Sequence, residues 1–214
     1  MNNITTNLTT EAVFSDDGIK RYQLVKTWDS FLPKLAIIML APSAASGIAL
    51  DNTTSLVLNN ADRLGYGSVA IVNLFATLND FSLAQAEGSD PENLKAILDI
   101  CQNADQIVYA PGTGKAKSKV LQCRQEQVLN ALRPFESKLN CLTNADGKAR
   151  LQHPLSPALK TWVLSPLSVS ELIEDPKPVV MVPKKRGYAQ GNQKRNRRIT
   201  KMLPAQHHWA GSLK

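Results

Sequence analysis

Strand-like and helix-like segments alternate along residues 34–143, and this alternation restricts the possible folds more than any other feature of the chain. The strand-like segments are short apolar runs rich in β-branched residues, which suit strands buried on both faces of a sheet. They are KLAIIML (34–40), SVAIVNLF (68–75), DQIVYA (105–110) and LNCLT (139–143). The segments between them place apolar side chains at helical spacing, over residues 50–64, 91–101 and 117–133. The pattern predicts an α/β domain in three layers, α/β/α, with a central four-stranded parallel sheet and helices on both faces.

The rest of the chain extends this domain at both ends. Residues 1–12 are polar and rich in Asn and Thr, and we expect a flexible N-terminal arm. Residues 21–28 alternate in the way expected of an edge strand. The α/β domain is predicted to span residues 13–175, and a basic C-terminal tail to occupy residues 176–214.

Composition restricts the location and the partners of the protein. Its formal charge of +7 and pI of about 9.4 favour a polyanionic partner. The three cysteines are odd in number and not closely paired, which is typical of reduced thiols in a cytoplasmic protein. The N-terminus has no apolar signal region, and no apolar run approaches the ~20 residues of a membrane helix. We therefore expect a cytoplasmic monomer without membrane association, and the sequence suggests no cofactor or metal.

Ligands of open parallel sheets bind beyond the carboxyl ends of the strands, so the segments that leave these strands are the candidate site. The first is Ala41-Pro42-Ser43, where small side chains allow a ligand to approach the backbone. The candidate ligand-binding residues are Pro42, Ser43, Asn73, Leu74, Phe75, Gly112, Thr113, Gly114, Pro154 and Ser156, and the candidate catalytic positions are Ala41 and His153.

Each of these segments also has a purely structural interpretation. The loop around Gly112 and Gly114 lacks the spacing of a Walker phosphate loop and suits a tight turn from strand to helix. Asn73 suits a buried cap for a neighbouring loop. His153, the only histidine of the predicted domain, suits a structural as well as a catalytic role. A Ser-His-Asp triad stays open, although Ser43 is not in a Gly-x-Ser-x-Gly elbow.

The blocks AVFSDDGIKRYQLVKTW, IIMLAPSAAS, GYGSVAIVNLFAT, DQIVYAPGTG and GKARLQHPLSP resemble, in order and spacing, the family named domain of unknown function 1643. This resemblance covers roughly residues 12–160 and implies a protein of bacteria, plasmids or phages. The family usually has Asn-Pro-Ser where this chain has Ala41-Pro42-Ser43. It implies no settled activity.

The arrangement is also similar, more distantly, to the uracil-DNA glycosylase superfamily. That similarity implies that Ala41-Pro42-Ser43 stands at the water-activating motif, and that Asn73 or Phe75 contacts the extruded base. His153-Pro154 with Ser156 would be the late motif, with Leu155 inserted. The alanine side chain has no donor or acceptor group that could orient a water molecule. Ala41 therefore implies either a natural loss of hydrolysis or an inactivating substitution.

Four functional hypotheses follow. The first is a DNA-binding protein of the uracil-DNA-glycosylase-like fold that extrudes a damaged or modified base and cleaves its N-glycosidic bond. The second is an inert binder of nucleic acid or of a modified base, the third is a protein that acts on free nucleotides, and the fourth is a protein-interaction role on a mobile element. The basic tail is interpreted either as a solubilising segment or as an arm that binds phosphates. Its cationic residues are Lys184, Lys185, Arg186, Lys194, Arg195, Arg197, Arg198 and Lys201.

Overall fold

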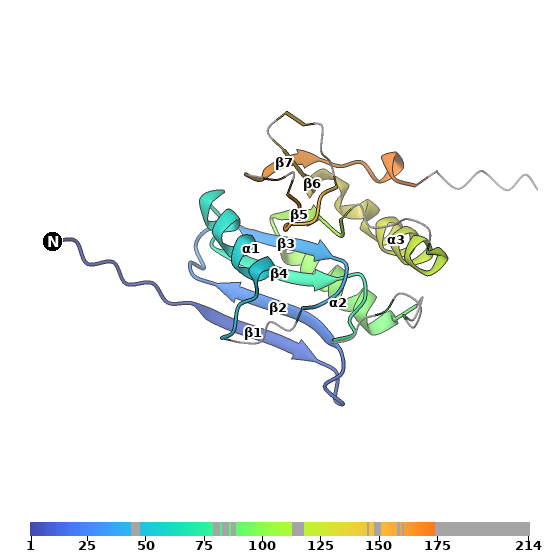
Figure 1. Cartoon of the computed structure of the whole chain (residues 1–214), viewed down its shortest axis with the longest axis horizontal. Coiled ribbons are helices and arrows are strands. Elements are labelled where there is room, and N and C mark those ends of the chain that lie inside the picture. The colour runs from blue at the N-terminus through green and yellow to red at the C-terminus, as the bar shows by residue number, and fades with distance from the viewer. Residues whose placement is uncertain are drawn as a thin grey trace, which may run out of the picture. The chain divides into compact units, whose positions relative to one another are not determined.

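The computed structural model of the chain describes residues 1–43, 48–78, 82, 86, 89–112, 118–144, 146–147, 151–157, 159 and 161–173. These residues form a seven-stranded sheet and three α-helices (Figure 1). The strands are β1 (Thr9–Phe14), β2 (Arg21–Thr27), β3 (Lys34–Met39), β4 (Ser68–Asn73), β5 (Gln106–Tyr109), β6 (Leu139–Thr143) and β7 (Val163–Pro166). The helices are α1 (Asn52–Arg63), α2 (Pro91–Asn103) and α3 (Lys119–Leu132), with the 3-10 helices η1 (Arg133–Lys138) and η2 (Val169–Glu171).

The sheet is mixed, with the strand order β1-β2-β4-β3-β5-β6-β7. The α/β class is confirmed, and the strands expected from the four apolar runs pair in parallel, β4 with β3, β3 with β5 and β5 with β6. The sequence predicted four parallel strands and one edge strand over residues 21–28, whereas the sheet has seven strands, because β1, β2 and β7 add antiparallel pairs at the two sides. An antiparallel pair can be joined by a short connection, as β1 and β2 are by residues 15–20, whereas residues 144–162 connect β6 to β7.

The N-terminal region also differs from the expectation. The predicted arm was to extend to residue 12, but β1 begins at Thr9 and pairs with β2. Strand β2 is therefore not an edge strand, since it lies between β1 and β4. The apolar alternation of β1 is short and its outer side chains are exposed, which explains why the sequence pattern did not reveal it.

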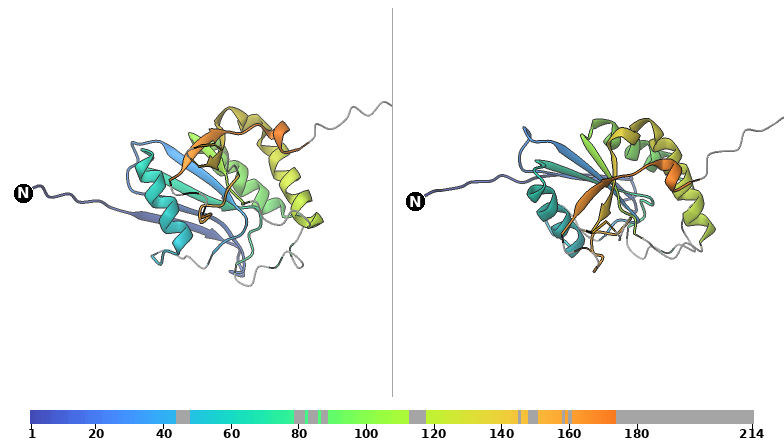
Figure 2. Two further views of the ribbon diagram at one scale, coloured as in Figure 1. Left: turned by 45° about the horizontal axis from the view of Figure 1, so that its top comes forward. Right: turned by 90° about the horizontal axis from the view of Figure 1, so that it is seen from above.

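Two hydrophobic clusters hold the three layers together. Figure 2 shows α1 on one face of the sheet and α2 and α3 on the other. Alternate side chains of β3 serve both clusters: Leu35, Ile37 and Met39 pack on the side of α1, and Ala36 and Ile38 on the side of α2 and α3. A strand that is buried on both faces has this unbroken apolar composition. The layer arrangement α/β/α follows from these contacts.

Each of the three α-helices begins at a side-chain cap. The Asp51, Asp90 and Ser118 side chains accept hydrogen bonds from backbone N–H groups in the first turns of α1, α2 and α3. Such caps satisfy N–H groups that have no partner within the helix. No helix among the described residues is long and apolar enough to cross a membrane. The described residues all belong to the unit Met1–Pro176, and the predicted tail, residues 176–214, lies outside the described part of the chain.

Candidate functional site at the carboxyl edge of the sheet

The exits of β3, β4 and β5 lie next to one another at the carboxyl edge. The backbone N–H groups of Leu74 and Phe75 donate to the carbonyl oxygens of Met39 (2.8 Å) and Leu40 (3.1 Å). On the other side, the Ala110 N–H donates to a β3 carbonyl oxygen at 2.8 Å. Main-chain pairing therefore continues beyond the strands and fixes Ala41-Pro42-Ser43 between the two neighbouring exits.

Arg21, at the start of β2, reaches this edge and holds the segment after β3. Its side chain is 2% exposed, and Nη1 donates to the carbonyl oxygen of Ser43 at 3.3 Å. Pro42 is buried, whereas Ala41 and Ser43 are half-buried. Burial lowers the pKa of Arg21 and the charge of Asp51 raises it. The first predicted segment thus lies against a buried cation.

Asp51 supplies a carboxylate to the same place. Its Oδ1 accepts the Thr54 N–H at 2.6 Å as the cap of α1. Burial alone would raise the pKa of Asp51. Hydrogen bonds from Ser43 and Thr54 lower this pKa below its usual value, and the positive charge of Arg21 lowers it further. The carboxylate is therefore ionised at neutral pH.

His153 lies within the electrostatic influence of that carboxylate. Burial lowers the pKa of His153, and the negative charge of Asp51 raises it by a smaller amount, so the imidazole is mostly neutral at pH 7. Its Nδ1 accepts the Leu155 N–H at 3.2 Å, so the neutral ring carries its proton on Nε2. His153 is thus prepared to donate a hydrogen bond from Nε2.

Gly112 packs directly against His153. A Cβ at position 112 would lie 3.1 Å from the His153 Cβ, and Gly112 has φ +86°, which other residues rarely adopt. The exit of β5 and the segment after β6 are therefore in contact, as expected for elements that leave the same edge. Thr113 and Gly114, predicted for the same loop, lie outside the described residues.

The remaining residues after His153 form a turn. The Ser156 N–H donates to the His153 carbonyl oxygen at 2.8 Å, and the Ser156 hydroxyl donates to Gln152 Oε1 at 2.6 Å. Pro154 is buried and Leu155 is 45% exposed. The Ser156 hydroxyl therefore stabilises the turn that orients the imidazole.

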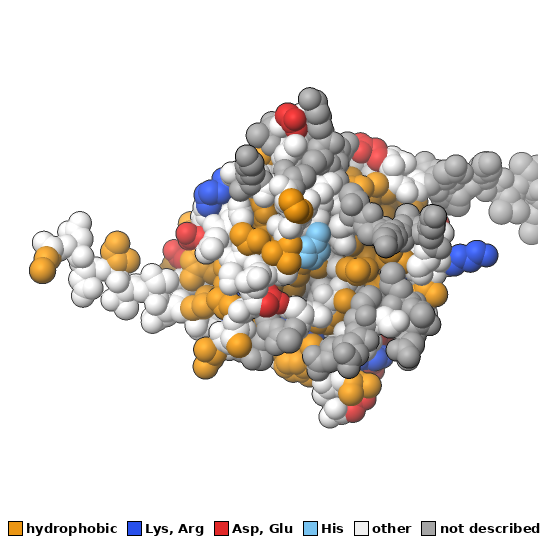
Figure 3. Space-filling model, in the orientation of Figure 1, with side chains coloured by type: hydrophobic (Ala, Val, Ile, Leu, Met, Phe, Trp, Pro, Cys, Tyr) orange, Lys and Arg blue, Asp and Glu red, His pale blue; other side chains and the backbone are white. Residues whose placement is uncertain are grey.

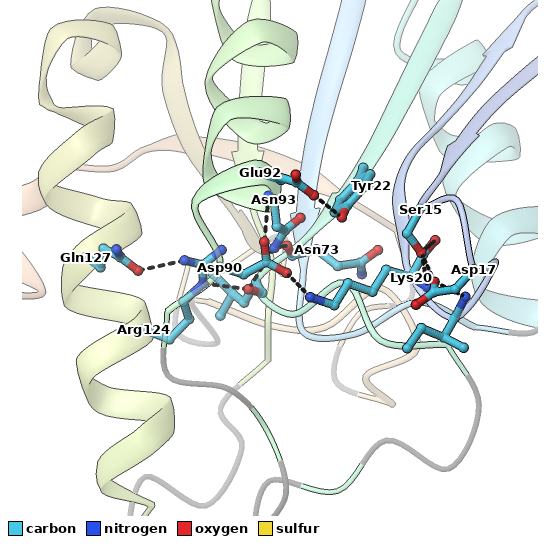
Figure 4. A network of polar contacts seen from close by, with 12 residues as sticks. Ser15, Asp17, Lys20, Tyr22, Asn73, Asp90, Glu92, Asn93, Arg124 and Gln127 are labelled. Atoms are coloured by element: carbon cyan, nitrogen blue, oxygen red, sulfur yellow. Dashed lines mark hydrogen bonds and ion pairs between the residues drawn. The ribbon is translucent and has the colours of Figure 1, made fainter.

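Side chains of α2 and α3 form hydrogen bonds with the backbone where the chain leaves β4, in the polar network shown in Figure 4. Asn93 Nδ2 donates to the carbonyl oxygens of Asn73 (3.0 Å) and Leu74 (3.1 Å), and Arg124 Nε donates to that of Leu74 at 2.7 Å. Asn73 and Leu74 are buried, and Phe75 is 4% exposed within a hydrophobic cluster. Main-chain atoms of this segment are thus anchored to α2 and α3, and the Phe75 ring is a core side chain.

The structure brings some of the predicted site residues together and leaves others in the core. Electrostatic and hydrogen-bond contacts join Ser43 and His153 to Asp51, and Gly112 contacts His153, whereas the described contacts of Phe75 are those of the core. Ser43 hydrogen-bonds to the carboxylate directly, which differs from a triad in which histidine stands between serine and carboxylate. Among the described residues, no group of three or more His, Cys, Asp or Glu could hold a metal ion.

Asp51 and Arg21 were missed by the sequence analysis. Asp51 precedes a helix and is typical of a cap, and Arg21 begins a strand where a charged residue usually faces solvent. The arrangement of a carboxylate, a neutral imidazole, a hydroxyl and a guanidinium provides a group that accepts a proton, a group that donates a hydrogen bond and a fixed positive charge. Such a set suits hydrolysis of a polar substrate.

Charge is distributed unevenly along the chain. Residues 176–214 contain ten Lys and Arg and no Asp or Glu, whereas residues 1–175 contain 15 basic and 18 acidic residues, a net charge of −3. On the face shown in Figure 3, hydrophobic side chains gather in the middle and the Lys and Arg side chains lie toward the edge. The excess positive charge of the protein thus belongs to the C-terminal segment.

Comparisons with known proteins identify the family but no characterised relative. Comparison with curated proteins found no match, and comparison with solved structures found none. Residues 21–155 match the family described as "Protein of unknown function (DUF1643)", and this range begins with β2 and includes Asp51, Gly112 and His153. Because the match covers more than half of the chain, this protein belongs to that family.

Proposed function

We propose that the protein binds DNA, takes an extruded base at the carboxyl edge of its sheet and hydrolyses the N-glycosidic bond of that base. The observation that carries the proposal is the convergence of an ionised Asp51, a neutral His153 and Ser43 beside small residues. A uracil-DNA-glycosylase-like fold is part of the same proposal. The α/β/α layers and the position of the site at the strand ends support it.

The chemistry assigns one role to each group. The Asp51 carboxylate orients a water molecule and accepts its proton as the water oxygen bonds to C1′ of the sugar. The electron pair of the breaking C1′–N bond passes to the base. His153 Nε2–H stabilises the developing negative charge on the base by donating a hydrogen bond and keeps its proton. The base leaves as an anion and takes up a proton from solvent, and Asp51 releases to solvent the proton that it accepted from water. Hydrogen bonds from Ser43 and Thr54 keep the pKa of Asp51 low, and the charge of Arg21 lowers it further, so the carboxylate stays ionised.

A second candidate is an inert binder of a modified base, and Ala41 favours it. In the family pattern, Asn at this position would orient water, and the alanine methyl group cannot. The two candidates share the site at the carboxyl edge and the basic tail, and they differ in turnover alone. In the hydrolytic proposal, Asp51 and Ser43 replace the missing amide.

The test is an excision assay on single- and double-stranded oligonucleotides that carry uracil, hypoxanthine or hypermodified bases, with abasic sites detected by alkaline cleavage. We expect excision by the wild type and a loss of about 10²–10⁴-fold in rate for Asp51→Asn. Asparagine is as good a helix cap as aspartate, so this variant keeps the start of α1. Asp99→Asn, an exposed carboxylate of α2, is the matched control and should retain full activity. Binding without excision on every substrate would favour the inert binder.

A further inference from the structure

A cleft lies beside Gly112, on the α3 side of the sheet. It has a volume of about 370 Å³ and lies between the end of β5, one face of α3 and the segment that follows η2. Its polar lining includes Tyr109, Gln122, Gln125 and Glu126, and its apolar lining includes Leu129 and Leu172. None of these residues is among the side chains assigned to catalysis above.

The polar groups of the cleft come mostly from one helix face. Gln122, Gln125 and Glu126 are spaced at i, i+3 and i+4 along α3, which places them side by side. No Lys or Arg lines the cleft among the described residues. The lining thus offers amide groups and a carboxylate, and it offers no positive charge to a phosphate.

Tyr109 adds a hydroxyl group that stays protonated. Burial raises the pKa of Tyr109 well above its usual range, so the phenol is neutral at any physiological pH. Its hydroxyl oxygen is buried and has no hydrogen-bond partner among the described residues. The Glu126 side chain is exposed, and no described residue forms an ion pair or hydrogen bond with its carboxylate.

We propose that this cleft binds a nucleobase that carries an exocyclic amino group, as a base or nucleoside without phosphate. The choice of a nucleobase rests on the proposed function, and the preference for an amino group comes from the lining. Carboxylate oxygens accept hydrogen bonds and donate none, so an amino group gains a bond at Glu126 where a carbonyl oxygen meets repulsion. The apolar side chains Leu129 and Leu172 suit the faces of a planar ring.

Size and position agree with this assignment. Ligand pockets span about 300–1,000 Å³, and a cleft at the lower end of that range suits a base or nucleoside better than a dinucleotide. Gly112 lines the cleft and also contacts His153. A base in the cleft would therefore lie next to the histidine that the proposed reaction uses, on the side of β5 and α3.

The experiment compares ligands that differ only in this group. The full chain is titrated with adenosine against purine riboside and with cytidine against pyrimidin-2-one riboside, in which hydrogen replaces the amino group, by calorimetry and by NMR of the Gly112 and Gln125 amides. We expect the amino member of each pair to bind about tenfold or more tightly, the factor of one hydrogen bond to a charged acceptor. Glu126→Gln should remove most of this preference, and Asp99→Asn, on α2, should keep it.

Each result has a distinct meaning. Equal or tighter binding of the ribosides without the amino group, or no shift at Gly112 and Gln125 with any nucleoside, would overturn the inference. A preference for amino bases that Glu126→Gln leaves intact would also overturn it, because the carboxylate would not be the selecting group. Base excision from DNA with no nucleoside in the cleft would refute the cleft alone. Nucleoside binding without any DNA binding would refute the proposed function alone.

Discussion

At the scale of single residues, Asp51 has two tasks that one carboxylate can perform together. It caps α1 through the Thr54 N–H, and its charge acts on Arg21 and His153. The first task needs an acceptor oxygen and the second needs a negative charge. Substitution by asparagine separates them, which is why that variant is informative.

His153 should make the stability of the protein depend on pH. Its pKa in the folded chain is lowered by burial, so the unfolded chain binds the proton more readily. The resulting stability is fully present above the ordinary histidine pKa of about 6.5 and is lost as the pH falls toward the folded value. Chemical denaturation between pH 7 and pH 5 should show a larger loss of stability for the wild type than for His153→Gln. Equal losses in the two proteins would mean that the imidazole is not buried as described.

Ala41 is the residue at which restored chemistry should increase the rate. Ala41→Asn provides an amide beside Ser43, where the family pattern has one. The expected gain in base excision is large, since one positioning group typically contributes about 10²–10⁴-fold. The assay is abasic-site formation at saturating enzyme, with Ala41→Ser as a smaller polar control. No gain in a folded Ala41→Asn protein would mean that Asp51 already holds the water, or that the protein is an inert binder.

At the scale of elements, α2 and α3 fix the end of β4 through main-chain carbonyl groups. Asn93 is fully buried in α2 and donates to two carbonyl oxygens. Arg124 is fully buried in α3 and donates to one of the same oxygens. These bonds satisfy carbonyl groups that have left the sheet, so they determine the path of the chain at the site.

Two asparagines of α2 allow a matched test of this anchoring. Asn93→Ala removes this donor from the Asn73 carbonyl oxygen and one of the two donors from the Leu74 carbonyl oxygen, which keeps Arg124. We expect a loss of about 1–3 kcal/mol in the free energy of unfolding. Asn103 is exposed and its amide reaches only Asp99 of its own helix, so Asn103→Ala should cost less than about 0.5 kcal/mol. Denaturant titrations of the two variants measure the difference. Similar losses would show that the network does not stabilise the fold.

The sequence pattern predicts some elements and not others for physical reasons. Strands β3 to β6 are buried on both faces, so their composition alone identifies them. Strand β7 is short, half exposed and ends at Pro166, so it lacks such a signal. Gly112 and His153 are 41 residues apart, and the rule for strand ends placed them at one edge, where they are in contact. Asp51 and Arg21 reveal their role only through neighbours that tertiary contacts bring together.

At the scale of the whole molecule, two parts of opposite charge divide the proposed function. Residues 1–175 carry the site and a net charge of −3, and residues 176–214 carry ten positive charges. An acidic domain gains little electrostatic binding free energy from the negatively charged phosphate backbone of DNA. The affinity for nucleic acid would then come from the basic segment, and base recognition would come from the domain.

Truncation after Asp175 tests this division. The shortened protein should bind DNA more weakly, and the dependence of log affinity on log salt should become shallower by up to ~0.9 for each phosphate that the basic segment neutralises. Titrations at several salt concentrations give both quantities for the full and the shortened chain. An unchanged salt dependence would mean that the basic segment does not bind nucleic acid.

The central claim is that a base enters the site around His153, and a structure of the complex tests it most directly. Asp51→Asn, which should bind without turnover, is crystallised as the full chain with a short oligonucleotide that carries a base found to be excised or bound. The account predicts electron density for the extruded base in contact with Gly112 and His153, with its sugar C1′ toward Ser43 and position 51. A base bound at another edge of the sheet, or an oligonucleotide with every base still stacked, would contradict the account.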